Sequence, residues 1–396
     1  MTQQIQINKI EYPQVSELCD FRKGKKVNST QTKTKDSVPY LLIDTLRGAE
    51  PEFFTEDKNY TEAIPDDILI VADGANSGLV GTGVSGAVGS TILRIRLKVK
   101  DLDKDYLSYF LKSKFEEFNK DMKGTGIPHL KPKNMLESKI RKPSLPEQTL
   151  IVQEIEKQFT RLDASIKSLK SVKQKLEVYR KAVLKKAFEK KDDWEGIYVR
   201  DMGKIITGKT PKTSIQEYYG DEFCFFKPGD LDKGYFVNDS VTKLSKKGLE
   251  VLKELPEKSI MVTCIGATIG KTGFNRVAGA TDQQINSIIV NQNKFVPEFL
   301  YYLFVSENGQ RNIIDNSSST TLPILNKSRF ENLNFFVTLL KEEQTLIVQS
   351  IESKFSVIDK IEQVVEESLK KSEKLRKSIL KSAFEGKLVK IEEVEE

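Results

Sequence analysis

The sequence predicts an α+β protein in which two globular modules are each followed by one long helix. Three observations predict this organisation. A stretch of 45 residues recurs later in the chain, both copies of it have the periodicity of long amphipathic helices, and the segments before them alternate strand-like runs with short helical runs.

The clearest sign of duplication is a seven-residue word, Glu-Gln-Thr-Leu-Ile-Val-Gln, which occupies 147–153 and again 343–349. Around it, 147–191 and 343–387 align without a gap, and 21 of 45 positions are identical. We therefore interpret the chain as two copies of one plan. The predicted domains are a first module at 1–145, a central long helix at 146–191, a second module at 192–341, a C-terminal long helix at 342–390 and an acidic tail at 391–396.

Shorter landmarks pair within the modules as well. The pattern Gly-Ala-x-x-Gly-x-x-Gly occurs at 74–81 and 266–273, and a Gly-Lys pair occurs at 24–25 and 208–209. The offset between paired landmarks rises from 184 to 196 along the chain and never falls. Such a drift indicates one ancestral module that gained a few insertions in its second copy.

The repeated stretches are predicted to be helices that pack against each other. Their apolar residues recur every three or four positions, and a helix of this length with one apolar stripe needs a partner. We expect an antiparallel coiled coil with pseudo-two-fold symmetry. The residues expected in its seam are Ile155, Phe159, Leu162, Ile166, Leu169 and Leu176 from the first helix and Ile351, Phe355, Ile358, Val365 and Ile379 from the second; Val172, Tyr179 and Leu375 belong to the same apolar stripes.

Within the modules, strand-like runs are predicted at 68–72, 92–99, 259–265 and 285–290, and short amphipathic helices at 105–118 and 296–308. The run at 92–98 alternates apolar and basic residues, so we expect one face of that strand to be buried and the other to lie in solvent.

The composition argues against several kinds of chemistry. With a single histidine, His129, the chain has no zinc site with two or more His ligands and is a poor candidate for a His-based catalytic triad. Three distant cysteines, Cys19, Cys224 and Cys264, exclude a disulfide framework and favour a reducing compartment. The longest apolar run, 299–305, is too short to cross a bilayer. We therefore expect a cytoplasmic protein without membrane contact.

Two glycine patterns resemble nucleotide-binding motifs. Gly81, Gly83 and Gly86 match a dinucleotide fingerprint, but the residues after them alternate like a strand instead of opening a helix. The sequence 266–272 resembles a P-loop, but it has three residues between its glycines where the motif needs four. Glycine turns between strands are the favoured interpretation of both.

Positive charge is concentrated in loops that could meet DNA. The stretch 22–36 combines six basic residues with amides and hydroxyls, and 207–213 is similar in kind. Lys and Arg bind phosphates, while Asn, Gln and Arg can read base edges. An exposed basic loop without a partner is the alternative, and the recurrence at the same place in both copies favours DNA. The predicted DNA contacts are Lys23, Lys25, Lys26, Lys33, Lys35, Lys123 and Lys131 in the first module and Lys209, Thr210, Lys212, Lys271, Gln283 and Gln284 in the second.

The first repeated helix is also basic, with 12 Lys or Arg against 3 acids in 157–191. Such charges are usually the solvated flanks of a helix seam. Contact with DNA or with an acidic partner protein are the alternatives.

These features together resemble the specificity subunits of type I restriction–modification systems, over essentially the whole chain. The resemblance rests on the helix opening Leu145-Pro-Glu-Gln-Thr-Leu-Ile, the closing Ala383-Phe-Glu-Gly386 and the loop Thr207-Gly-Lys-Thr-Pro211. The first copy departs from the pattern, because Lys23-Gly-Lys-Lys-Val27 lacks the Thr-Pro pair.

The resemblance implies two target-recognition domains, each of which binds one half of a split, asymmetric site in double-stranded DNA. It implies that the chain is not an enzyme and binds no metal or cofactor. Two methyltransferase subunits would supply S-adenosylmethionine and methylate adenine at N6, with or without ATP-dependent restriction subunits in the complex. The main rival hypothesis is a duplicated coiled-coil scaffold whose globular ends bind other proteins.

Overall fold

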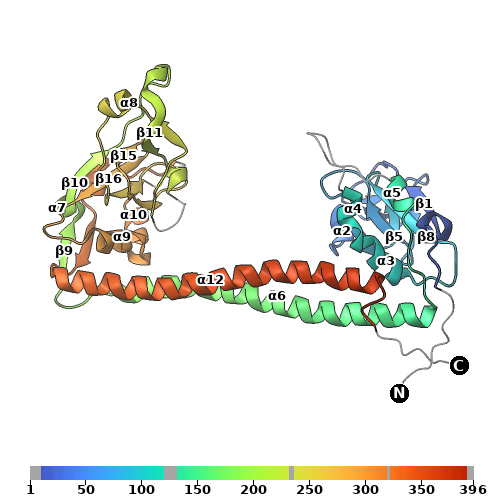
Figure 1. Cartoon of the computed structure of the whole chain (residues 1–396). Coiled ribbons are helices and arrows are strands. Elements are labelled where there is room, and N and C mark those ends of the chain that lie inside the picture. Colours follow the sequence, from blue (N-terminus) through green and yellow to red (C-terminus); the bar gives the residue numbers. More distant parts are fainter. Residues whose placement is uncertain (1–9, 120–131, 232–235, 319–321, 390–396) are drawn as a thin grey trace. The chain divides into compact units, whose positions relative to one another are not determined.

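The computed structural model describes residues 10–119, 132–231, 236–318 and 322–389. The chain divides into two compact units. Unit 1 comprises Met1–Leu169 and Glu367–Glu396, and unit 2 comprises Lys170–Glu366. Each unit holds one globular module and a part of two long helices, α6 (Leu145–Ala187) and α12 (Lys341–Phe384) (Figure 1).

The module of unit 1 contains two four-stranded sheets. One has the strand order β1-β8-β5-β6 and is antiparallel throughout, and the other has the order β3-β2-β7-β4 with a parallel pair β2–β7. The strands are β1 Cys19–Lys23, β2 Val38–Leu41, β3 Phe54–Thr55, β4 Glu62–Ala63, β5 Ile68–Val71, β6 Val80–Thr82, β7 Gly86–Val88 and β8 Ile92–Leu97.

The module of unit 2 repeats this arrangement. Its antiparallel sheet has the order β10-β16-β13-β14, and its second sheet has the order β12-β11-β15 with a parallel pair β11–β15. A two-stranded sheet, β17-β9, is added. The strands are β9 Glu195–Tyr198, β10 Gly203–Thr207, β11 Tyr219–Phe226, β12 Thr242–Leu244, β13 Ile260–Thr263, β14 Thr272–Phe274, β15 Gly279–Thr281, β16 Ile285–Val290 and β17 Asn334–Val337.

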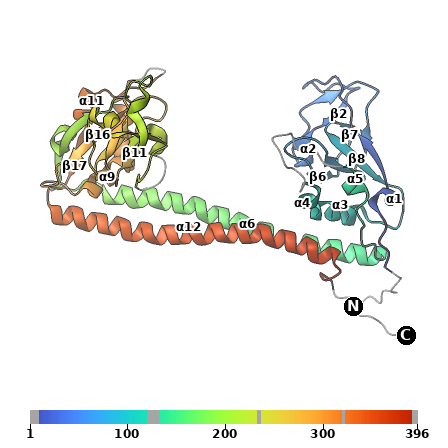
Figure 2. The same ribbon diagram turned by 45° about the horizontal axis from the view of Figure 1, so that its top comes forward.

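Short helices cover the sheets. In unit 1, α3 lies between the sheet and the long helices, whereas β2 and β7 lie at the far end of the module (Figure 2). In unit 2, α9 and α10 take the corresponding place. The helices are α1 Val15–Leu18, α2 Ile43–Leu46, α3 Lys104–Ser113, α4 Phe115–Asn119, α5 Pro132–Leu136, α7 Val199–Met202, α8 Lys246–Glu250, α9 Pro297–Val305, α10 Glu307–Asp315 and α11 Lys327–Glu331, with 3₁₀ turns η1 Gln216–Tyr218 and η2 Pro228–Asp230.

The prediction for the strand at 92–98 was wrong for Arg94, whereas Lys98 on the same face is exposed as expected. The second sheet of unit 1 covers Arg94, which donates to the Glu62 oxygen of β4 at 3.3 Å, and its side chain is only 5% exposed. Its charge is compensated by Asp20, whose Oδ2 lies 2.6 Å from Nη2. Arg96 pairs in the same way with Asp67, a carboxylate with no exposed surface. A buried charge is tolerated when it is paired in this way.

The long helices pair antiparallel in each unit. In unit 2, ion pairs join Lys173 to Glu366 and Lys191 to Glu343. The residue numbers rise on one side of these pairs and fall on the other, as antiparallel segments require. In unit 1, the end of α12 lies beside the start of α6, where a Cβ on Gly386 would come within 3.1 Å of the Arg141 side chain.

All eleven residues expected in the seam are buried or half-buried. Three other members of the predicted stripes are not. Val172, Tyr179 and Leu375 are 37%, 50% and 51% exposed, because a stripe with this spacing is wider than the contact that one partner helix can cover.

Among the described residues, no helix is long and apolar enough to cross a bilayer.

One side chain of the seven-residue word explains why that word recurs. Gln148 is completely buried, and its amide oxygen accepts a hydrogen bond of 2.7 Å from the Asp103 backbone N–H. Its amide nitrogen donates to the backbone oxygens of Asp101 and Pro143 at 3.0 and 2.8 Å. The side chain thus joins the first turn of α6 to the loop that precedes α3.

The second copy contains the same junction. Gln344 is also completely buried, accepts from the Val296 N–H at 2.8 Å, and donates to the oxygens of Lys294 and Thr338 at 3.3 and 2.9 Å. Both modules are therefore attached to their long helix by the same three hydrogen bonds, and each junction sits in a hydrophobic core that includes residues of both long helices.

We predict that Gln148→Leu lowers the free energy of unfolding by about 2–4 kcal/mol, because it leaves one buried N–H and two buried carbonyls without partners. Chemical denaturation followed by circular dichroism measures this decrease. Gln153→Leu, at the exposed end of the same word, is the matched control and should change stability by no more than about 0.5 kcal/mol. Equal effects of the two substitutions would contradict the role of the buried amide.

Candidate nucleic-acid interface

Each module carries a hairpin turn built on two glycines with left-handed backbone. The turn joins β5 to β6 in unit 1 and β13 to β14 in unit 2. The φ angles are +100° and +90° at Gly74 and Gly78, and +98° and +87° at Gly266 and Gly270. Glycine adopts such angles without strain. In unit 1 the turn is closed by the Gly78 N–H, which donates to the Val71 oxygen at 2.7 Å.

The hairpins show which structure is formed by the two glycine patterns that resemble nucleotide-binding motifs. In both copies a strand follows the turn, so no helix N-terminus is available to hold a phosphate. Gly81 lies in β6 and Gly86 begins β7, and β8 comes next. The P-loop and the dinucleotide fingerprint are therefore turns and strands, as the sequence favoured.

A second loop, with the Gly-Lys pair, passes close over the end of a neighbouring strand. In unit 1 the Gly24 N–H donates to the Ile92 oxygen at 2.8 Å and the Lys25 N–H donates to the Val88 oxygen at 3.1 Å. A Cβ on Gly24 would lie 2.1 Å from the Gly89 oxygen, which is shorter than any tolerated contact. Glycine is therefore required here.

The Gly-Lys pair of unit 2 has the same contacts. The Gly208 N–H donates to the Ile285 oxygen and the Lys209 N–H to the Thr281 oxygen, both at 3.0 Å. A Cβ on Gly208 would lie 2.0 Å from the Asp282 oxygen. The two loops are thus equivalent in backbone and differ in the side chains that they present.

In each unit the two loops are neighbours. Lys23 of unit 1 pairs with Asp73, which immediately precedes the glycine hairpin, at 2.8 Å. In unit 2, Thr210 is hydrogen-bonded to Gln283, and the next carbonyl, that of Gln284, accepts from the Cys264 N–H at 2.7 Å. We call these surfaces the loop clusters: residues 23–35, 57–61 and 72–78 in unit 1, and residues 207–212, 264–271 and 282–284 in unit 2.

Two titratable groups of the unit 2 loop cluster have pKa values that are raised by burial. Burial raises the pKa of the Cys264 thiol to about 12, so it is not a nucleophile at neutral pH. Burial also raises the pKa of Asp282, and the hydrogen bond from the Gln284 N–H and the charge of Lys227 oppose this rise. Across the described parts of the chain, no cluster of three or more His, Cys, Asp or Glu could hold a metal ion.

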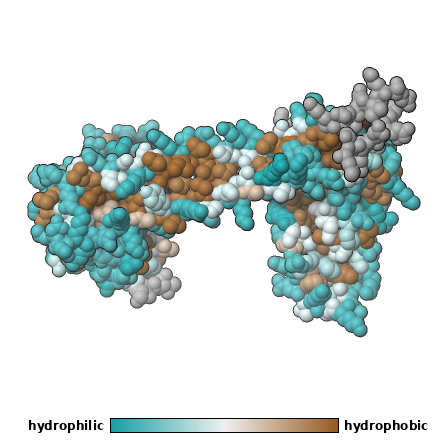
Figure 3. All heavy atoms as spheres, turned by 90° about the horizontal axis from the view of Figure 1, so that it is seen from below, coloured by the Kyte–Doolittle hydropathy of each residue, from teal (hydrophilic) through white to brown (hydrophobic). Residues whose placement is uncertain are grey.

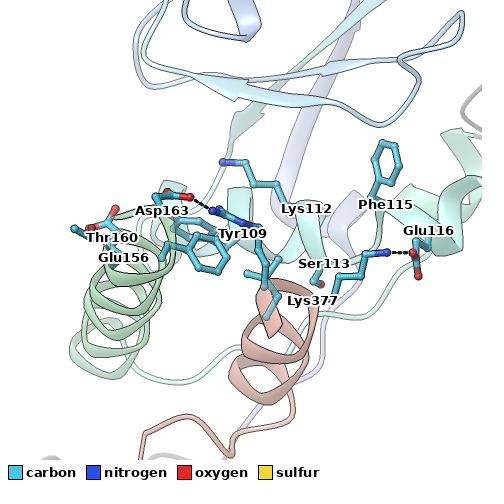
Figure 4. A pocket seen from close by; sticks show the side chains of 12 residues that line it. Tyr109, Lys112, Ser113, Phe115, Glu116, Glu156, Thr160, Asp163 and Lys377 are labelled. Carbon is cyan, nitrogen blue, oxygen red and sulfur yellow. Dashed lines mark hydrogen bonds and ion pairs between the residues drawn. The ribbon is translucent and has the colours of Figure 1, made fainter. Parts of the chain in front are cut away.

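A separate pocket of about 750 Å³ opens in unit 1 where α3 meets the long helices (Figure 4). Ion pairs join Arg376 to Asp163 and Lys377 to Glu116 across it. Phe159 packs edge-on against Tyr109, with ring centroids 5.8 Å apart.

The aromatic and ionic contacts of this pocket recur in unit 2. There Tyr302 packs against Phe355 at 5.9 Å, and Arg180 pairs with Asp359. Because the same contacts fasten both modules to the long helices, we interpret the pocket of unit 1 as part of a structural junction.

Comparison with known proteins identifies the duplicated architecture. A family model described as the type I restriction modification DNA specificity domain matches residues 8–178 and again residues 191–371. The two matches together cover most of the chain and coincide with its two copies. The chain belongs to this family.

Two of the relatives in the specificity family match along most of their length. The specificity subunit of the type I restriction enzyme MjaVIII of Methanocaldococcus jannaschii is 25% identical, over 96% of this chain and 92% of the relative. The specificity subunit of the EcoBI enzyme of Escherichia coli is 24% identical, over 89% and 81%. That of the HindI enzyme of Haemophilus influenzae reaches 36% identity, but over 38% of this chain and 32% of the relative.

Solved structures share the fold. A chain from a type I restriction–modification system, solved to explain complex assembly and conformational transition, superposes with a TM-score of 0.78 at 16% identity, over 97% of this chain and 100% of that one. The HsdS subunit of Thermoanaerobacter tengcongensis gives 0.59 at 15% identity, over 96% and 97%.

In unit 1 of this specificity chain, the residues predicted to contact DNA differ in the contacts that their side chains make within the protein. The ammonium of Lys25 donates to Oδ1 of Asn59 at 2.5 Å, and that of Lys33 lies 5.9 Å from the centre of the Phe54 ring. Lys26 and Lys35 are exposed, and neither has an ion-pair partner among the described residues. With Lys23, these five residues lie on the loop cluster. The predicted contacts Lys123 and Lys131 lie outside the described residues.

The contacts predicted for unit 2 lie together. Lys209 and Lys212 are exposed. Thr210, which lies between them in the sequence, is hydrogen-bonded to Gln283. Gln284 and Lys271 are half-buried on the hairpin side. The structure thus gathers the six predicted residues on one loop cluster, and their contact with DNA stays a prediction.

Sequence reasoning missed residues that complete both clusters. Arg47 lies beside the hairpin of unit 1, with Nη2 2.5 Å from Oδ1 of Asn76. In unit 2, the Pro323 oxygen accepts from the Gly266 N–H at 3.0 Å, which brings Leu322 and Ile324, 53% and 38% exposed, to the hairpin. The sequence carries no local signal for these contacts, because they join residues that are distant in the chain.

Two basic residues of α6 form ion pairs with acidic residues of α12. In unit 2, Lys173 lies 3.1 Å from Glu366 and Arg180 lies 3.0 Å from Glu362. These pairs favour the interpretation of the helix charges as flanks of the seam over contact with DNA.

We predict that the double substitution Lys25→Ala with Lys26→Ala weakens binding of the complex to all DNA sequences alike. It should flatten the log–log dependence of affinity on salt by roughly 0.9 for each phosphate that the chain no longer neutralises. Fluorescence anisotropy at several salt concentrations measures both. The control is Lys100→Ala with Lys139→Ala, two exposed lysines of the same module away from the loop cluster. If the two double variants give the same slope as the unchanged chain, the loop cluster of unit 1 does not touch DNA.

Proposed function

We propose that this chain is the DNA-recognition subunit of a type I restriction–modification complex and that each module reads one half of a split, asymmetric site in double-stranded DNA. One observation carries the proposal. The two loop clusters have equivalent backbones, closed by the same hydrogen bonds, yet they present different side chains. Base readout depends on which donors and acceptors reach the groove edges, so different side chains on equivalent loops select different bases.

The chain itself would be non-catalytic and would bind no cofactor. In support, its glycine patterns form hairpins and the buried thiol of Cys264 is not nucleophilic. The methyltransferase subunits would bind S-adenosylmethionine and transfer its methyl group to adenine N6, and ATP would be used by restriction subunits that join them. Residues of this chain contribute by holding the DNA and by placing those partners on it.

The paired helices offer a surface for two methyltransferase subunits. Apolar side chains gather over the helices on the face seen in Figure 3. The exposed apolar residues of α12 in unit 2 are Leu346, Val357, Ile361 and Val364, which are between 40% and 65% exposed. Exposed apolar surface of this kind marks protein interfaces. The rival hypothesis of a scaffold that binds only proteins finds no support, since both family matches are to DNA specificity domains.

An exchange of modules tests the proposal. We predict that replacing 192–341 with a second copy of 1–146, with both helices kept, gives a complex that methylates a palindromic split site built from two inverted copies of one half-site. The physical reason is that both modules attach through the same buried glutamine. Sequencing that detects methylated adenine reads the outcome.

The reciprocal hybrid, with 192–341 in both places, is the matched control and should select the other half-site as a palindrome. A first hybrid that is folded and active but keeps the original target would show that the second module does not read DNA.

A further inference from the structure

In unit 1 the residue that follows α2 is an exposed arginine whose backbone is held firmly in place. The N–H of Arg47 donates to the Asp44 oxygen at 3.0 Å and so closes the helix. Leu46 beside it is buried against β6, where a Cβ on Gly81 would come within 2.9 Å of the Leu46 side chain. The backbone of Arg47 is therefore fixed beside the β5–β6 hairpin, although its side chain is 52% exposed.

Two side chains orient the guanidinium group of Arg47. Its Nη1 donates to Oδ1 of Asp44 at 3.3 Å, and its Nη2 donates to Oδ1 of Asn76 in the hairpin at 2.5 Å. The hairpin places Asn76 in turn, because the Asn76 backbone oxygen accepts from the Leu79 N–H at 3.0 Å. A guanidinium group has more N–H donors than these two bonds use, so donors remain for a ligand. They lie in one plane, and the two partners set its direction.

The hairpin connects this arginine to the basic residues of the loop cluster. Asn76 of the hairpin accepts from Arg47, and Asp73, three residues earlier, pairs with Lys23 of the Gly-Lys loop at 2.8 Å. Lysines bind phosphates and fix a protein on the duplex, whereas contacts to base edges carry the sequence information. The loop cluster thus combines cations suited to phosphates with one oriented group suited to a base.

An oriented guanidinium group fits one base best. Guanine presents two acceptors, N7 and O6, on its major-groove edge, and no other base does so. Two N–H donors in one plane match this pair. A phosphate would also accept from Arg47, but the carboxylate of Asp44, whose side chain is 82% exposed, would repel it. The edge of guanine is uncharged and meets no such repulsion.

The hairpin of unit 2 has different neighbours. A Cβ on Gly266 would lie 3.8 Å from Cδ1 of Leu322 and 3.8 Å from Nε2 of Gln284. An amide side chain suits adenine, and an apolar side chain suits the methyl group of thymine. The two hairpins therefore differ in the chemistry beside them, which is a guanidinium group in unit 1 and an amide with an apolar side chain in unit 2.

We propose that Arg47 is a specificity-determining residue that reads a guanine in the major groove of the half-site bound by unit 1, and that Asp44 and Asn76 are its positioning residues. This inference deepens the proposed function and rests on it, since it takes the module of unit 1 to bind one half of a DNA site.

The test measures base preference and salt dependence on the same complex. The full chain is combined with the methyltransferase subunits of its system, and methylated adenines are mapped to obtain the motif. Duplexes that differ from the motif by one base pair then compete for binding at several salt concentrations. Arg47→Ala should reduce the preference for one G·C pair, in one half-site, by about tenfold or more, and should leave the other positions unchanged.

Two further variants separate readout from charge. Arg47→Lys keeps the charge, but it should also reduce the preference for this G·C pair, because an ammonium group lacks the planar pair of donors. Asn76→Ala leaves Arg47 in place and removes one of its two partners. It should reduce the same preference by a smaller factor than Arg47→Ala, at the same position of the motif.

The matched control is Arg200→Ala. Arg200 is also an exposed arginine that donates to an asparagine, Asn332. It lies in α7, which precedes β10, whereas the Gly-Lys loop of unit 2 follows that strand. This substitution should leave both half-sites and the salt dependence unchanged.

Three results would overturn the inference. A base preference that Arg47→Ala leaves unchanged would exclude readout by this residue. Equal weakening for all sequences, with a log–log salt dependence flatter by roughly 0.9, would identify a phosphate contact. Weaker attachment of the methyltransferase subunit with an unchanged motif would identify a protein contact. In all three cases the complex still selects a split site and the proposed function stands, whereas a complex of the unchanged chain that prefers no sequence would refute the proposed function itself.

Discussion

The attachment of each module to its long helix depends on one buried amide side chain. Gln148 and Gln344 are completely buried, and each satisfies one N–H and one carbonyl of the loop before α3 or α9 and one carbonyl of the segment before its own long helix. Buried backbone groups without partners are costly, so the loop and the helix are held in one relation. The hydrophobic core of each module includes residues of both long helices, and the strands of that module carry the loop clusters.

This constraint explains the pattern of similarity between the two copies. Residues that form the junctions are retained, including Phe159 with Phe355 and Asp163 with Asp359, because each packs or pairs at the place where a module meets the long helices. The loop clusters carry no such constraint beyond their glycines. A duplicated chain can therefore vary the side chains of its loop clusters while the attachment of each module stays the same.

Much of the fold could be predicted from sequence because its main signals are local. The long helices, the hairpins and the duplication were all visible as periodicity or repeated words. What could not be predicted depends on pairs distant in the chain. The burial of Arg94 needs a second sheet that covers it, and the meeting of Thr210 with Gln283 needs the strand register. Tyr179 and Leu375 fit the stripe, but only the packing reveals that they are exposed.

Two modules that are held by the same junction but carry different loops should read two different half-sites. The most direct measurement is a map of methylated adenines in DNA modified by this chain together with its methyltransferase subunits. We expect one split motif, with two half-sites of different sequence at a constant spacing. A single continuous motif, or two identical half-sites, would contradict this expectation.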